Sequence, residues 1–247
     1  MEWLLLDYRP STLFSLKSSY ATSAVGKTLV LPSPYVVKMA FVNAGFRAGR
    51  GADFCADMVR RLATVELRIR PARESVVTQT IQRVRSPKED KGKRETAKQP
   101  VGRPGKPVVY QSTVAYREMV WLRGHWTWAF RLDEGPRLAK DLLVLAPSVN
   151  WVGKRGSLVQ FVGYSKADNI GSDFTCPVEG ATAVQQAVSA HVAPLDDFGP
   201  DASFPALNSF DPKGELKIGK HRVIVPTIVP AGVTSTGHGF VRYSGIG

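Results

Sequence analysis

The feature that most constrains this chain is a strongly basic segment, residues 83–106, that cannot form a packed core. The segment has nine Lys or Arg residues and three acidic ones, a net charge of +6. It is rich in proline and glycine and nearly free of large apolar residues, so it cannot bury a face of its own. The flanking residues, 75–84 and 108–120, are rich in Val, Thr, Ile and Tyr, which is typical of strands. We predict a long β-hairpin arm with a mobile basic tip; the alternative is a solvated loop that binds nothing.

The charge of the whole chain points to an acidic partner. The 247 residues include 33 Lys or Arg and 21 Asp or Glu, a net charge of +12, and the arm segment accounts for half of this surplus. Nucleic acid is the commonest partner of such a basic chain, because Lys and Arg displace counterions from phosphates. The alternative is a basic protein with no acidic partner, since net charge concerns association and does not determine the fold.

Several classes of protein are excluded by composition. A hydrophobic content of 43% is enough for a real core, and the length suits one domain, 1–247, with a divergent portion at 165–247 completing or extending the sheet. No apolar run approaches the ~18–20 residues of a membrane span, and no basic segment precedes the first apolar run as in a signal peptide. Cys55 and Cys176 are the only cysteines, which excludes a disulfide framework and a CxxC zinc site. We therefore expect a cytoplasmic protein without cofactor or metal.

Local patterns predict alternating helices and strands. Ser33 and Pro34 are suited to the N-cap and first position of a helix that continues through residues 35–44 and ends at Gly45. Periodicity predicts further helices at residues 52–62, 137–145 and 181–190, and strands at 65–70, 113–122, 126–132, 157–164 and within 216–229. This order predicts an α+β fold: a modified ferredoxin-like or RRM-like antiparallel sheet with helices on one face and the long hairpin added.

Three loops are candidate phosphate-binding segments. In Gly153-Lys154-Arg155-Gly156-Ser157 two glycines flank two cations before a strand, so that backbone, charges and hydroxyl can approach a phosphate; the alternative is an ordinary turn. Residues 21–28 nearly match a P-loop, but Pro32 and Pro34 leave no helix to supply its amides, so a basic loop near a phosphate backbone is the better interpretation. The Gly-rich tail, 232–239, is either a phosphate loop or a flexible terminus.

The remaining chemical signals are weak. None of the four histidines has metal-ligand spacing, and no Gly-x-Ser-x-Gly elbow is present. His125 and His238 are candidate proton carriers for RNA cleavage, although a surface or capping role is the commoner one. Trp121, Trp126 and Trp128 either stack on bases or pack in a sheet core, and their alternation favours the core.

Together these motifs resemble the CRISPR-associated Cas-five family of the RAMP superfamily, which caps the foot of type I Cascade-like complexes. The resemblance rests on the entry to the first helix with Lys38 inside it, the basic hairpin at 76–114, and the segments Thr113–Val120 and Val152–Ser157. It implies a modified ferredoxin-like (RAMP) fold whose hairpin "thumb" packs against a backbone subunit. It also implies binding of the 5′ handle of the guide RNA (crRNA), contact with the large subunit, and an indirect relation to target DNA. One subtype cleaves precursor RNA, but its Tyr/Lys/His set has no clear counterpart here.

The function expected is therefore that of a non-catalytic RNA-binding subunit in antiviral defence. The alternatives are a metal-independent endoribonuclease that processes precursor crRNA and a basic RNA-associated assembly protein. The expected RNA-binding residues are Lys27, Ser33, Lys38, Arg47, Arg83, Arg85, Gly153, Lys154, Arg155, Gly156, Ser157 and His238.

Overall fold

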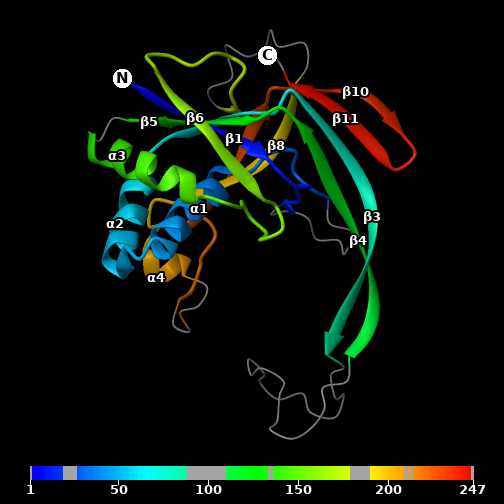
Figure 1. Cartoon of the computed structure of the whole chain (residues 1–247), viewed down its shortest axis with the longest axis horizontal. Coiled ribbons are helices and arrows are strands. Elements are labelled where there is room, and N and C mark those ends of the chain that lie inside the picture. Colours follow the sequence, from blue (N-terminus) through cyan, green and yellow to red (C-terminus); the bar gives the residue numbers. More distant parts are fainter. Residues whose placement is uncertain are drawn as a thin grey trace, which may run out of the picture.

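The computed structural model describes residues 2–18, 27–87, 110–132, 136–178, 190–208, 211 and 214–245 (Figure 1). Most of residues 21–28, the segment at 88–109 and all but the last residue of the helix predicted at 181–190 lie outside these ranges. The strands form three antiparallel sheets, in the orders β2-β5-β1-β6, β10-β11-β3-β4 and β7-β9-β8. Among the described helices, none is long and apolar enough to cross a membrane.

The first sheet has the ferredoxin-like connection that the sequence predicts. Its strands are β1 (Trp3–Pro10), β2 (Leu67–Arg70), β5 (Trp126–Arg131) and β6 (Val159–Ala167). Helices α1 (Pro34–Arg47) and α2 (Gly51–Ala63) connect β1 to β2, and α3 (Pro136–Leu145), followed by the short η1 (Ala146–Ser148), connects β5 to β6. This is a β-α-β-β-α-β order with an arm inserted between the second and third strands. The α+β prediction is confirmed, and α1, α2 and α3 lie on the same side of the sheet (Figure 1).

The core lies between this sheet and the helices. Alternate side chains of β1, including Leu4, Leu6 and Tyr8, are fully buried, as period-2 alternation requires. The Tyr8 ring stacks on Trp128 with 3.9 Å between centroids, and Phe41 of α1 packs edge-on against the same indole. A continuous apolar cluster extends from Leu4 to Ala231, so the C-terminal strands share the core of the first sheet.

One predicted helix boundary is wrong for a physical reason. Gly45 does not end α1, which continues to Arg47. A Cβ at Gly45 would lie 3.2 Å from the Phe54 ring and 3.3 Å from Cys55 Sγ, so this glycine permits close packing of α1 on α2. The chain turns instead at Gly49 and Gly51, whose positive φ angles of 70° and 82° suit glycine.

The arm consists of β3 (Glu74–Pro87) and β4 (Tyr110–Arg123), paired without interruption from Glu74↔Arg123 to Pro87↔Tyr110. At about 3.4 Å per residue it extends roughly 45 Å, and it curves away from the body (Figure 1). The hairpin prediction is confirmed.

Of the C-terminal strands, the one within residues 216–229 is predicted by the sequence, and the others are not. The tail at 232–239 is neither a phosphate loop nor a flexible end: β10 (Ala231–Gly237) and β11 (Phe240–Gly245) form a hairpin, and β11 pairs with β3. The third sheet contains β7 (Cys176–Pro177), β8 (His191–Phe198) and β9 (Arg222–Val229), and the short α4 (Phe204–Leu207) follows β8.

Candidate nucleic-acid interface

The glycine-flanked loop at 153–157 is held rigidly against the N-terminal part of the chain. Gly153 has a φ of 71°, and a Cβ there would lie 3.3 Å from Leu16 Cδ1. Thr12 fixes the other end, since its hydroxyl donates to the Gly156 carbonyl at 2.6 Å and accepts from the Leu158 amide at 2.8 Å. The loop therefore presents Lys154 and Arg155, both exposed, from a fixed backbone.

The same N-terminal segment joins this loop to the base of the arm. Phe14 forms an antiparallel bridge with Val120 of β4, with N···O distances of 2.9 and 2.7 Å. A second bridge joins Lys17 to Thr28, and the Thr28 amide donates to Glu118 Oε2 at 2.9 Å. We call this junction the arm root and define it as residues 11–18, 27–28, 117–120 and 153–157.

Cations from four separate segments gather at the arm root. Burial lowers the pKa of Lys154, and the charge of Arg117 lowers it further. The root also carries three other cations, Lys17, Lys27 and Arg155, all exposed, and one carboxylate, Glu118. Such a concentration of positive charge on a fixed backbone is suited to successive phosphates. Lys17 and Arg117 were missed from the sequence, because only the fold brings them to the loop.

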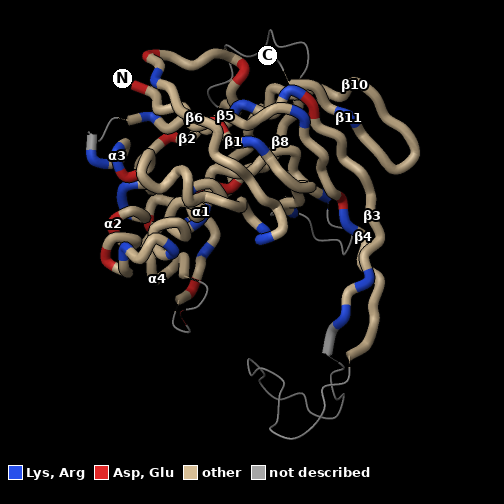
Figure 2. The backbone as a smooth tube through the Cα atoms, in the orientation of Figure 1, with Lys and Arg blue, Asp and Glu red and all other residues tan. Residues whose placement is uncertain are grey.

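The arm carries further cations beyond the arm root. Arg83 and Arg85 are exposed on β3, opposite Val114 and Ser112, and Figure 2 shows basic positions along the arm strands. By strand alternation the same face carries exposed apolar and aromatic side chains, which are Ile81, Tyr110, Val114 and Tyr116. Interleaved guanidinium groups and aromatic rings are typical of surfaces that bind single-stranded nucleic acid.

Arg47 lies at the end of α1 close to the segment that leads into the loop. Its Nη1 donates to the Ser148 carbonyl at 3.2 Å, and its guanidinium lies 4.6 Å from the centre of the Trp151 ring. Its exposed side chain thus adds a cation beside the loop at 153–157.

Three predicted RNA contacts are buried in this structure. Lys38 is 1% exposed and its Nζ lies 2.7 Å from Asp197 Oδ1, so its charge is already paired inside the protein. Ser33 is fully buried at the start of α1. Ser157 is 4% exposed, and its Oγ accepts from the Ser15 amide at 3.3 Å. These side chains are enclosed by the protein and do not present donors to a ligand.

The two candidate histidines lie on different elements. His238 is exposed in the turn between β10 and β11, so it belongs to the edge of the arm sheet and not to the loop at 153–157. His125 lies in the turn after β4, with Nε2 3.7 Å from Asp7 Oδ1. Among the described residues no cluster of His, Cys, Asp or Glu could hold a metal ion.

The tryptophans divide between the two roles considered. Trp126 and Trp128 are fully buried, as the core interpretation predicts. For Trp121 that interpretation is wrong: it lies on the outer face of the arm and is 48% exposed, because its neighbours Val120 and Leu122 occupy the inner face.

No protein-family model and no curated protein matches the sequence. The solved structures similar to the chain include two CRISPR proteins. One, a crystal structure of a CRISPR protein from Archaeoglobus fulgidus, has a TM-score of 0.43 and 11% identity over 100% of this chain and 93% of that one. The other belongs to a CRISPR RNA-guided surveillance complex and has a TM-score of 0.44 and 17% identity over 92% and 90%. Because both TM-scores are below 0.5, the function is inferred from the residues of this chain.

Proposed function

We propose that this chain is a non-catalytic RNA-binding subunit of a cytoplasmic CRISPR surveillance complex, and that its arm root holds the 5′ handle of the guide RNA. The observation that carries the proposal is the convergence of Lys17, Lys27, Arg117, Lys154 and Arg155 on one rigid junction. The resemblance of the helix entry, the hairpin and the loop to the Cas-five family supplies the CRISPR context.

The geometry favours a single-stranded ligand. The arm root offers separate cations on a loop and on strand β4, and the arm adds Arg83, Arg85 and exposed tyrosines along one face. Phosphates would be bound at the root, while unstacked bases would lie on the Tyr110 and Tyr116 rings. In this proposal the arm also contacts a neighbouring backbone subunit, and the large subunit approaches the assembled foot.

The test is a salt series with variants of the loop. Lys154→Gln and Arg155→Gln each remove one phosphate contact, so each is expected to weaken binding of a handle RNA. Each should also reduce the slope of log K against log salt by about 0.7, the value for a single strand. Fluorescence anisotropy between low and moderate salt measures both quantities. Lys220→Gln, an exposed lysine outside the arm root, is the matched control and should change neither.

Two further results would contradict the proposal. Unchanged affinity and slope in both loop variants would remove the loop from the interface, and equal competition by unrelated RNA would indicate a general RNA-associated assembly protein. Precursor RNA incubated in EDTA with excess protein is expected to remain intact. Cleavage lost in His125→Ala or His238→Ala would establish an endoribonuclease instead.

A further inference from the structure

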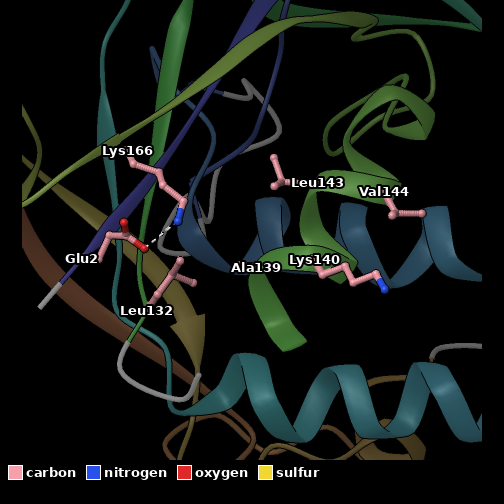
Figure 3. A pocket seen from close by; sticks show the side chains of 7 residues that line it. All are labelled: Glu2, Leu132, Ala139, Lys140, Leu143, Val144 and Lys166. Atoms are coloured by element: carbon pink, nitrogen blue, oxygen red, sulfur yellow. Dashed lines mark hydrogen bonds and ion pairs between the residues drawn. The ribbon is translucent and has the colours of Figure 1, made fainter. Parts of the chain in front are cut away.

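A groove lies at the far end of β6 from the arm root. Its volume is about 630 Å³, and it is bounded by the beginning of β1, the end of β5 and helix α3 (Figure 3). Seven residues line it: Glu2, Leu132, Ala139, Lys140, Leu143, Val144 and Lys166. Since β6 separates the groove from the loop at 153–157 by several strand residues, roughly 23 Å, the two sites are distinct.

The groove is aliphatic within and basic at its edge. Ala139 and Leu143 are one helical turn apart on α3 and face Leu132 across the opening (Figure 3). Val144 is 57% exposed at the rim of the groove. Lys140 is exposed at the edge, and Lys166 lies on the opposite wall with its Nζ 2.9 Å from Glu2 Oε2.

We propose that this groove binds an amphipathic helix of another protein, one with an aliphatic stripe bordered by acidic residues. The exposed Lys140–Val144 row forms an i, i+4 ridge against which a second helix can pack. Ala139 and Leu143, partly buried against the protein's own core, line the groove beside this ridge, and the small Ala139 permits a close approach. Lys140, exposed at the edge, supplies the charge that selects an acidic border, and Arg137, 76% exposed although its Nη2 lies 3.7 Å from Asp57 Oδ2, adds to it.

Two other occupants fit less well. A second copy of this chain would bring its own net charge of +12 to a basic edge, which opposes association. RNA would find no aromatic ring among the lining residues on which to stack. The inference does not depend on the proposed RNA binding, and the two are tested by different variants.

The first experiment uses two synthetic helical peptides with the same leucine stripe, one with glutamates and the other with lysines on the remaining positions. The acidic peptide is expected to bind the purified full chain, and the basic peptide is not. Lys140→Glu and Val144→Glu, both at exposed positions, should each weaken the acidic peptide at least about tenfold, while Lys220→Glu should have no effect. The proposal would be overturned if the acidic peptide did not bind or if both peptides bound equally. It would also be overturned if the groove variants bound the acidic peptide as tightly as the wild type does.

The occupant is then identified in the native assembly. A photo-crosslinking amino acid at position 144 should link to an aliphatic-acidic helical segment of another protein; a link to RNA or to a second copy of this chain, or no link, would overturn the proposal. RNA affinity and thermal unfolding of Lys140→Glu are expected to stay unchanged. Lys154→Gln should bind RNA more weakly and should bind the acidic peptide with unchanged affinity. A failure of either proposal is therefore distinguishable from a failure of the other.

Discussion

Lys38 is a buried lysine whose charge is paired with Asp197 of β8. Burial lowers the pKa of Lys38 and raises the pKa of Asp197, and in each case the charge of the partner opposes that effect. The pair joins α1 to the third sheet, so a residue first assigned to RNA instead holds two parts of the fold together. Sequence alone could not show this, since the partner lies far along the chain in a strand that no local pattern marked.

Removing one member of this pair should be costly. Lys38→Met leaves the Asp197 carboxylate without its cation, and we expect a loss of about 3 kcal/mol in the free energy of unfolding, at the low end for a buried pair because Asp197 is 26% exposed. Urea unfolding measures it. The double variant Lys38→Met/Asp197→Asn should recover part of this loss of unfolding free energy. If the single and double variants lost the same amount, the pair would have no specific role. RNA affinity of Lys38→Met should be unchanged.

At the scale of elements, α2 and α3 are joined by a network of charges. Asp57 of α2 contacts Arg60, Arg61 and Arg137, and Arg61 also reaches Asp141 of α3 at 2.9 Å. The pKa of Asp57 lies below its ordinary value, chiefly because Arg60 donates a hydrogen bond to it, with further lowering by the charges of Arg61, Arg60 and Arg137.

This network makes a prediction about acid stability. A carboxyl whose pKa is lowered in the folded state stabilises the fold above its unfolded pKa of about 3.9. That contribution is lost as pH falls through the lower, folded value. Asp57→Asn should therefore be less stable than the wild type at neutral pH, and the difference should shrink as the solution is acidified. Unfolding free energies at a series of pH values test this, with the exposed Asp201→Asn as control; a difference independent of pH would contradict it.

Elements with a clear period could be predicted, and elements formed by long-range pairing could not. The helices at α1, α2 and α3 and the strand β6 were visible because apolar residues recur at the spacing of each structure. The tail at 232–239 has small polar residues and glycines, which do not by themselves indicate a strand. It lies in a β-hairpin because β11 pairs with β3. The arm root was half visible: the loop at 153–157 carries its own glycine and cation pattern, whereas Lys17 and Arg117 reach it only through the Phe14 and Thr28 contacts.

At the scale of the whole molecule, positive charges lie at the arm root and along the arm strands as well as on the helices (Figure 2). A protein of this kind should retain its RNA through purification. We expect tagged protein from its native host to carry RNAs that share one 5′ end and resist moderate salt. Sequencing the co-purified RNA tests this, and a heterogeneous population would contradict a handle-specific role.

The insertion of the arm between β2 and β5 has a consequence for how its length can change. Both arm strands leave the body at fixed positions, Glu74 and Arg123, so residue pairs can be added or removed further out without altering the first sheet. One pair moves the tip by about 3.4 Å but turns the side chains beyond it to the opposite face, whereas two pairs move it about 7 Å and preserve the facing. The facing of the arm is therefore kept only when its length changes in steps of two residue pairs, and related proteins with a longer or shorter arm should differ from this one by an even number of pairs.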